Sequence, residues 1–442
     1  MSNHAASPTV ATATLGDRAR VADSVTRSLK RRYAAERRFR LYGLSAIIFS
    51  VLALGLLMVT IVSKGLPAFT QATIRLDVTL YPQEIDPKGE RRWEVLSGAD
   101  YQGLVRESLK ELFPDVSTRK DLRELYALVS PGAAYRVRAM VMDDPSLIGQ
   151  RITITVPLAD DMDQFAKGHI SADDAEGSRR VSDQQIAWFE RLSDRGLIER
   201  SFNTTLFTNG DSRSPELAGV WGAVVGSFWT MLITLVLSFP LAVGASIYLE
   251  EFAPKNRLTD LIEVNINNLA AVPSIVFGLL GLAVFINFFG LPRSAPLVGG
   301  MVLALMTLPT IIIASRAALK SVPPSIREAA LGVGASKMQS TFHHVLPLAM
   351  PGMLTGTIIG MAQALGETAP LLMIGMVAFI VDIPAGPLDP ATVMPVQIYL
   401  WSDAPERAFV ERASAAIMIL LGFLVIMNLL AVLLRRQFER QW

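Results

Sequence analysis

A single carboxylate interrupts a long apolar stretch in the carboxyl-terminal half of the chain. Glu367 is the only charged residue in 345–381, which also lacks histidine. Placing a carboxylate in a membrane-spanning helix costs about 2.5 to 3.5 kcal/mol, so we expect this one to face a partner group or a wet cavity. Gly366 lets another backbone approach closely, and Pro370 frees a carbonyl from the helix ladder. The carboxylate can therefore meet a solute or pair with a donor.

A second informative segment, REAALGVGASKMQSTFHHVLP, occupies 327–347 between two apolar stretches. Ser325 followed three residues later by Glu328 has the pattern of a capping box, which predicts that a helix starts there with both preceding prolines outside it. Two glycines, the second being Gly334, predict its end, and Ser336 can cap a second helix. A tight connector between two membrane helices would show the same pattern.

Several kinds of site are excluded by composition. The chain has no cysteine, which removes disulfides and thiolate metal sites, and its four histidines argue against a zinc site. A net charge of +1 offers nothing to steer nucleic acid. The P-loop pattern G-x-x-x-x-G-K-[ST] does not occur. We therefore expect no catalytic residue, no metal and no ATP site in this chain.

The elements that position these residues are long segments without charge. Hydrophobic residues make up 51% of the chain and charged residues 18%. Besides the stretch that holds Glu367, segments without any charged residue or histidine occupy 41–63, 217–249, 264–292, 294–315 and 413–434. Each exceeds the about 20 residues that cross a bilayer as a helix, and lipid leaves backbone groups no other partners. The pattern predicts an all-α polytopic membrane protein with six transmembrane helices.

Basic residues before the first apolar segment set the predicted orientation. They are Arg27, Lys30, Arg31, Arg32, Arg37, Arg38 and Arg40. The positive-inside rule keeps this end in the cytoplasm; binding to anionic lipid head groups is the other interpretation. We expect 1–40 to be a cytoplasmic basic tail and 41–63 an uncleaved first transmembrane helix, because its apolar core exceeds that of a signal peptide. Six spans then place 64–216 outside, 316–344 inside and the carboxyl terminus inside.

The outside segment, 64–216, is predicted to be a small inserted α+β domain. Residues 74–81 and 151–158 alternate as half-buried strands do, whereas DYQGLVRESLKELF, STRKDLRELYALV and SDQQIAWFERLSDRG have helical spacing and start signals. Acid pairs occur in DDPSL, ADDMD and ADDAEG, without the spacing of a calcium loop. We interpret these pairs as solvated turns, and no chemistry is assigned to the domain.

The charged hairpin resembles the EAA loop of ABC-transporter permeases. The matching residues are Glu328-Ala329-Ala330, Gly334 and Leu346-Pro347, whereas His344 occupies a position that is apolar in the family. In that family the loop is a coupling helix seated in a cleft of the cytoplasmic ATPase subunit. The resemblance therefore implies a coupling loop at 316–347. Its implied coupling residues are Ser325, Arg327, Glu328, Ala329, Ala330 and Gly334.

The core 217–442 most resembles the PstA-type membrane subunits of phosphate importers. The motifs are AAVPSIVFGL at 270–279, REAALGVGASK at 327–337, GETAPLL at 366–372 and MPVQIYLWSDAP at 394–405, and the similarity extends over 217–440, about half of the chain. It implies a type I ABC importer permease-like core with five transmembrane helices. Segment 64–216 resembles the extended amino-terminal region of some members, and phosphate is implied only by the resemblance.

Within this resemblance, Gln363, Glu367 and Thr368 are the candidates for the substrate pathway. The family often carries an arginine one turn before GETAP, where this chain has Gln363. The cationic charge for an anion must then come from a partner subunit, from Arg316, or be replaced by neutral donors. Glu367 either accepts a hydrogen bond from protonated phosphate or holds a cationic side chain along the path, or pairs with a donor between subunits.

The resemblance also implies partners. They are an ATP-binding subunit (PstB-like), a second permease (PstC-like), a periplasmic phosphate-binding protein (PstS-like) and membrane lipids. This chain itself would bind no cofactor and would be a transport subunit rather than an enzyme, with ATP used by its partner. The implied location is the bacterial inner membrane, with multiple passes and both termini in the cytoplasm.

Other functions stay open from the residues alone. An importer of this type could carry another oxyanion, such as molybdate or sulfate. An ion-coupled secondary transporter would need its own coupling-ion site and usually an internal repeat, and no convincing repeat is visible. A membrane sensor would need a cytoplasmic output module, for which the predicted inside loops are too short.

Overall fold

The computed structural model describes residues 15–175, 177 and 179–438, and the chain divides into two compact units, 1–60 and 61–442. The described part of the first unit belongs to α1 (Leu15–Gly65), which carries an apolar stretch long enough to span a membrane. The predicted transmembrane segment 41–63 lies within this helix. The helix begins earlier, because the polar residues before the apolar segment are also good helix formers. Residues 1–14 of the predicted basic tail lie outside the described residues.

The second unit holds four more helices that are apolar and long enough to span a membrane. They belong to α10 (Trp221–Ile247) with the π-helical η5 (Tyr248–Phe252), α13 (Pro296–Ser321), α16 (Leu346–Gly366) with α15 (Lys337–Gln339) and η7 (Ser340–Val345), and α19 (Arg407–Phe438). The predicted span 264–292 is instead a bent pair: α11 (Arg257–Ala270) meets α12 (Ser274–Leu280) and η6 (Gly281–Phe288) at 104°. Pro273 stands at the bend, where it cannot donate to the helix ladder.

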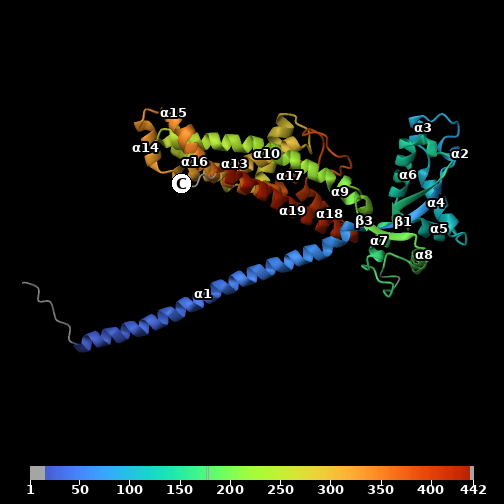
Figure 1. The fold of residues 1–442 in the computed structure, drawn as a ribbon, viewed down its shortest axis with the longest axis horizontal. Helices are drawn as coiled ribbons and strands as arrows, with labels where there is room; N and C mark the ends of the chain where they lie inside the picture. Colours follow the sequence, from blue (N-terminus) through green and yellow to red (C-terminus); the bar gives the residue numbers. More distant parts are fainter. Residues whose placement is uncertain (1–14, 176, 178, 439–442) are drawn as a thin grey trace, which may run out of the picture. The chain divides into compact units, whose positions relative to one another are not determined.

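The long helices of this unit pack through small residues. Helix α13 lies between α10 and α16, and α16 also packs against α19 (Figure 1). A Cβ atom on Gly300 of α13 would lie 2.6 Å from the Ile233 side chain of α10. The Thr234 hydroxyl donates to the Gly300 carbonyl at 3.2 Å. Such close backbone approach, with hydrogen bonds between helices, is how membrane helices associate when lipid offers no hydrophobic drive.

Residues 66–217, named here the sheet region, contain a three-stranded antiparallel sheet in the order β2-β1-β3. The strands are β1 (Thr70–Thr79), β2 (Arg151–Pro157) and β3 (Ile198–Phe202). Leu76 faces Ile154 across the β1-β2 pair, so the apolar alternation of both strands falls on one face. The strands predicted near 74–81 and 151–158 are confirmed. Strand β3 was missed because it is short and mostly exposed.

Helices cover this sheet around one core that includes Ile74, Leu104, Val137 and Trp188. The three predicted helices are present as α4 (Tyr101–Leu112), α5 (Arg119–Tyr126) and α8 (Asp183–Asp194), each capped by a side chain. Two others, α6 (Gly132–Asp143) and α7 (Asp160–Ala166), were not predicted. Shorter elements are η1 (Leu66–Phe69), α2 (Pro82–Ile85), α3 (Trp93–Ser97), η2 (Pro145–Leu147), α9 (Thr205–Thr208) and η4 (Pro215–Leu217).

Candidate functional site

The charged hairpin folds as two short helical segments, but its first helix begins differently from the prediction. Helix α14 (Pro324–Gly332) has Pro324 at its first position, and Ser325 makes no capping hydrogen bond. The predicted capping box of Ser325 and Glu328 is therefore wrong. A proline suits the first helical position because its φ is preset and its missing N–H has no helix partner there. This starts the helix one residue before the serine.

The end of α14 and the start of the next segment follow the prediction. Gly334 has φ +89°, the left-handed conformation that favours glycine, and the Ala335 N–H donates to the Ala330 carbonyl at 3.0 Å. Ser336 then forms a full capping box with Gln339. The hairpin is thus closed at its turn by backbone and side-chain hydrogen bonds.

The hairpin exposes an apolar patch that sequence reasoning missed. Leu331, Val333, Met338 and Phe342 are all exposed, Val333 to 87%; we call these four residues the hairpin patch. Of the residues expected to couple to a partner, Ser325, Glu328, Ala329 and Gly334 are exposed, whereas Ala330 is buried. Leu331 and Val333 lie at the end of α14, whereas Met338 and Phe342 belong to a helical stretch that is apolar enough to span a membrane. The sequence did contain a signal for this exposed apolar group, namely bulky apolar residues within the predicted inside loop 316–344.

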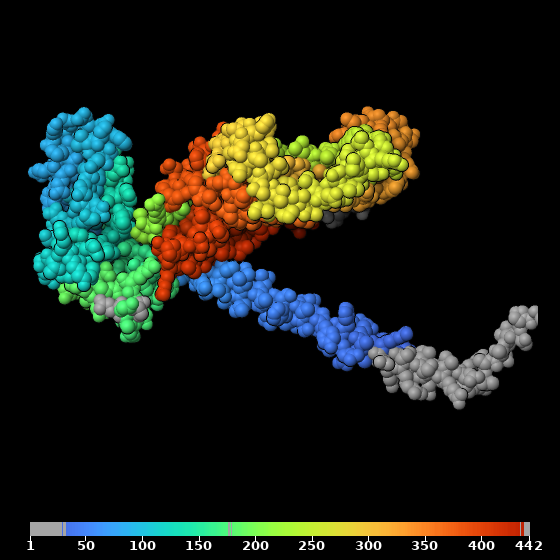
Figure 2. Space-filling model, turned by 180° about the vertical axis from the view of Figure 1, so that it is seen from behind, coloured from blue at the N-terminus to red at the C-terminus, as the bar shows by residue number. Residues whose placement is uncertain are grey.

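Arg327 is engaged by other parts of this chain. Its Nη2 lies 2.7 Å from Glu251 Oε1 and donates to the Leu319 carbonyl at 3.0 Å, and its Nη1 donates to the Val322 carbonyl at 2.8 Å. The Glu251 side chain is only 7% exposed. One guanidinium thus joins α14 to η5 at the end of α10 and to the end of α13. Figure 2 shows the hairpin, in orange, beside this yellow-green segment.

A second set of ion pairs lies close to the first. Arg316 Nη2 of α13 lies 2.5 Å from Glu263 Oε1 of α11, and Arg316 Nε lies 3.5 Å from Glu250 Oε2 of η5. Lys320 Nζ lies 3.6 Å from the same Glu250 oxygen. The Arg316 side chain is 14% exposed and is engaged by these carboxylates. Three membrane-associated elements therefore meet through charge beside the hairpin.

The predicted pathway residues lie where a helix breaks. Helix α16 ends at Gly366, Glu367 is extended (φ −78°, ψ 125°), Thr368 follows it, and α17 starts at Ala369. The apolar stretch 345–381, predicted to hold one transmembrane helix, is therefore helical in this span only as far as Gly366. Glu367 and Thr368 are half-buried and Gln363 is exposed. Among the described residues, the Glu367 carboxylate has no hydrogen-bond or ion-pair partner.

The segment after this break packs tightly on the bent pair. A Cβ atom on Gly278 of α12 would lie 2.7 Å from Pro370 Cα and 2.8 Å from its carbonyl oxygen. Only a glycine allows α12 to approach the backbone of α17 (Ala369–Met373) so closely. The chain continues through α18 (Met394–Ser402) into α19. The segment that follows Glu367 is therefore positioned by close backbone packing.

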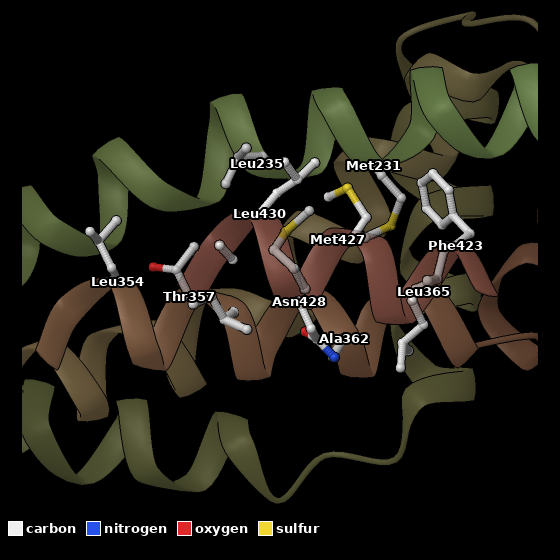
Figure 3. Close-up of a pocket in the computed structure, with 14 residues that line it drawn as sticks. Met231, Leu235, Leu354, Thr357, Ala362, Leu365, Phe423, Met427, Asn428 and Leu430 are labelled. Atoms are coloured by element: carbon white, nitrogen blue, oxygen red, sulfur yellow. The ribbon is translucent and has the colours of Figure 1, made fainter. Parts of the chain in front are cut away.

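An apolar cavity of about 290 Å³ lies between α10, α16 and α19 (Figure 3). Thr357 and Asn428 are its polar members, set among leucine, methionine and phenylalanine side chains. None of the predicted pathway residues lines it. An anion that entered this apolar cavity would lose its hydrating water molecules and find few hydrogen-bond donors to replace them. The cavity therefore does not suit an anionic solute.

A buried charge cluster joins the sheet region to α19. Lys167 Nζ lies 2.7 Å from Asp163 Oδ2 and 3.0 Å from Glu411 Oε2, and the three side chains are 5 to 8% exposed. The Gln164 amide donates to Glu411 Oε1 at 2.9 Å. The interpretation of ADDMD as a solvated turn is therefore wrong: these residues start α7, and Asp163 accepts from the buried Ala72 N–H at 2.7 Å.

More acids than cations gather around this cluster. Arg412 of α19 is buried and donates to the Ala218 carbonyl at 3.3 Å. Buried Glu216 accepts from Ser130 Oγ at 2.6 Å. Burial, together with the charges of neighbouring acids, raises the pKa of Asp160 to about 7. One carboxyl of the cluster therefore changes its charge near neutral pH.

Comparison with known proteins gives two family matches in separate parts of the chain. The family described as "Binding-protein-dependent transport system inner membrane component" matches residues 217–441. A "Domain of unknown function (DUF3333)" matches residues 26–176. The charged hairpin, the helix break and the bent pair all lie in the first match.

Individual relatives cover about half of the chain. A probable ABC transporter permease protein, YqgI of Bacillus subtilis (strain 168), is 31% identical over 188 residues, which are 42% of this chain and 63% of that protein. The phosphate transport system permease protein PstA 1 of Mycobacterium tuberculosis (strain CDC 1551 / Oshkosh) is 30% identical over 217 residues, 49% of this chain and 70% of that protein. An inward-facing structure of the MetNI methionine ABC transporter aligns at 18% identity and a TM-score of 0.40, covering 50% of this chain and 98% of that one.

Proposed function

We propose a function from one established premise: this chain belongs to the family of binding-protein-dependent transport-system inner-membrane components, whose pattern covers residues 217–441. It is a permease-type subunit of an ABC importer. The proposed task of this subunit is to pass inorganic phosphate across the bacterial inner membrane, with both termini in the cytoplasm. The sheet region then lies on the periplasmic side.

The observation that carries this proposal is the anchored hairpin. Its apolar patch faces outward, while Arg327 fixes its base to η5 and to the end of α13. An ATP-binding subunit of the PstB type seats on this surface and hydrolyses ATP, whereas this chain binds no cofactor. Tightly packed helices move as rigid bodies rather than deforming. A movement of the hairpin is therefore transmitted to α10 and α13 through the Arg327 guanidinium, which contacts η5 and the end of α13.

Phosphate is proposed from the relatives and from the helix break. Two of the relatives are named as ABC and phosphate transport permeases. Glu367 stands at the break with no hydrogen-bond or ion-pair partner among the described residues. It can accept a hydrogen bond from a monoprotonated phosphate, with Gln363 and Thr368 as neutral donors. A second permease of the PstC type completes the path and supplies cationic groups. A periplasmic phosphate-binding protein of the PstS type delivers the ion.

The experiment that tests this proposal is uptake of radiolabelled phosphate by proteoliposomes that contain the chain with its membrane partners. We expect uptake that needs internal ATP and the binding protein, and that a tenfold excess of molybdate or sulfate barely reduces. Stronger inhibition by either competitor than by unlabelled phosphate would reassign the substrate. Uptake by the lone chain under a proton gradient would identify an ion-coupled transporter instead.

A further inference from the structure

The sheet region contains a polar cleft of about 240 Å³ that the transport function does not use. It lies between α4, α5 and the segment that leads into α6. Its polar lining comes from Gln102, Arg106, Arg123, Tyr126 and Ser130. No acidic residue lines the cleft. The cleft therefore presents two permanent positive charges, an amide and the Tyr126 hydroxyl, whereas the Ser130 hydroxyl donates its proton to the Glu216 carboxylate.

Among the described residues, the sheet region holds arginines with and without an ion pair, and two of those without one line this cleft. Arg75, Arg92, Arg151 and Arg191 each form an ion pair, with Glu199, Glu90, Glu111 and Asp115 respectively. Among the residues that the structure describes, Arg106 and Arg123 pair with no carboxylate. Both arginine side chains are exposed and line the same cleft, so a small anion bound there would be attracted by both positive charges. Because no carboxylate of the described residues neutralises these two arginines, an anion that enters the cleft gains the full electrostatic attraction of both.

The walls of the cleft are held in place before any ligand arrives. The Arg106 guanidinium carbon lies 5.5 Å from the centre of the Tyr126 ring, a cation–π contact that orients the side chain. Ser130, on the floor, is 2% exposed. Its hydroxyl donates to Glu216 Oε1 at 2.6 Å and accepts from the Gly132 N–H at 3.1 Å. The contact with Tyr126 therefore reduces the conformational entropy that the Arg106 side chain loses when an anion binds.

From this geometry we propose that the cleft between α4, α5 and the start of α6 binds a small inorganic oxyanion, held by Arg106 and Arg123. Guanidinium groups donate pairs of parallel hydrogen bonds to oxyanions such as phosphate and sulfate. Gln102 adds amide donors at the rim. The site lies in the sheet region, apart from the helix break that holds Glu367, and it exists whether or not the membrane part carries phosphate.

Isothermal titration calorimetry of the full chain in detergent, with inorganic phosphate and then with sulfate in an oxyanion-free buffer, tests this site. We expect one saturable site per chain, weakened about tenfold or more when both arginines are removed in the R106Q/R123Q variant. The control R151Q removes an exposed arginine that is paired with Glu111, and it should bind as the parent does. Unchanged affinity in R106Q/R123Q, or no saturable binding by the parent, would overturn the proposal.

A further variant separates this site from the transport path. The E367Q variant should bind phosphate in the calorimeter with the affinity of the parent, whether or not it still supports phosphate uptake. If E367Q loses the binding and R106Q/R123Q keeps it, the anion sits at the helix break and the cleft proposal fails. Thermal unfolding of each variant checks its fold; should R106Q/R123Q unfold, the single variant R123Q replaces it, because Arg123 is exposed and makes no ion pair among the described residues.

Discussion

Lys167 Nζ lies 3.0 Å from Glu411 Oε2, and this buried contact links α7 of the sheet region to the start of α19. The same ammonium lies 2.7 Å from Asp163 Oδ2. Asp163 in turn fixes the backbone of β1. A membrane-associated helix and the central strand of a folded sheet are thus connected through charged side chains, so that the sheet region and α19 are expected to move together.

Replacing Lys167 by methionine should loosen this connection. The change removes the ammonium that contacts both Asp163 and Glu411, and breaking a buried ion pair in this way costs about 3 to 5 kcal/mol. Thermal or denaturant unfolding of the purified chain measures the loss, and limited proteolysis shows whether the sheet region becomes accessible. The matched control is Arg151→Ala, which removes an exposed pair with Glu111 and should change stability by about 0 to 1 kcal/mol. Equal losses in the two variants would contradict the buried connection.

Stability should also depend on pH through Asp160. Its pKa is raised from 3.8 to about 7, first by burial and then by the charges of Asp161, Glu216, Asp163 and Glu411. Between these two pH values the folded chain binds a proton that the unfolded chain has lost. The contribution of Asp160 to stability therefore falls as pH rises from about 4 to about 7, and is lowest above 7.

The variant Asp160→Asn removes this titration. Unfolding midpoints measured from pH 5 to pH 8 should fall less steeply with pH in the variant, and at pH 8 the variant should be the more stable chain. The exposed Asp194 gives the control, since Asp194→Asn should leave the slope unchanged. A slope identical in Asp160→Asn and the parent would refute the assignment.

Arg327 should matter for coupling more than for insertion. Arg327→Ala leaves the buried Glu251 carboxylate without its cation and frees two carbonyl groups, so α14 loses its link to η5 and α13. We expect the protein to reach the membrane, with uptake falling while ATP hydrolysis by the partner continues. Arg327→Lys should rescue poorly, because an ammonium cannot reproduce the branched set of hydrogen bonds. Full uptake in Arg327→Ala would show that the hairpin does not act through this residue.

Glu328→Lys tests the outer face of the same helix. Its carboxylate is exposed and has no ion-pair partner among the described residues, so the substitution should leave the unfolding temperature unchanged. We expect it to uncouple uptake from ATP through the changed charge at the partner contact. Uptake at the parent rate would contradict a role for Glu328 at that contact.

Gly278 controls the position of the helix break. A Cβ atom there would collide with backbone atoms of Pro370, which cannot rotate away. Gly278→Ala should therefore displace the segment that carries Glu367 and reduce uptake, while a substitution at Gly244, where an added Cβ meets nothing within 4 Å, should be tolerated. Equal uptake by Gly278→Ala and Gly244→Ala would show that this packing does not position the pathway.

Local patterns predicted local structure well. Uncharged segments of sufficient length became the long helices α10, α13, α16 and α19, since lipid permits little else. The caps Asp100, Thr118 and Ser182 marked helix starts correctly. Ser325 failed as a cap because the proline before it is itself a good first residue, a competition that the serine pattern does not reveal.

The rest depended on contacts between distant parts of the sequence. Arg327 and Glu251 are separated by 76 residues, and Lys167 and Glu411 by 244. Nothing in the local sequence pairs them. The bend at Pro273 was also unpredictable in size, because membrane helices tolerate proline both with and without a kink: Pro309 lies inside the unbroken α13.

The coupling role of the hairpin is tested most directly by measuring on which side of the membrane the hairpin lies and which molecule it contacts. The chain has no cysteine, so Val333→Cys places one thiol on the exposed hairpin patch. We predict that in the assembled transporter this thiol crosslinks to the ATP-binding subunit and resists a membrane-impermeant reagent added outside intact cells. Labelling from outside, or crosslinking to lipid alone while ATP is hydrolysed, would contradict a coupling role for the hairpin.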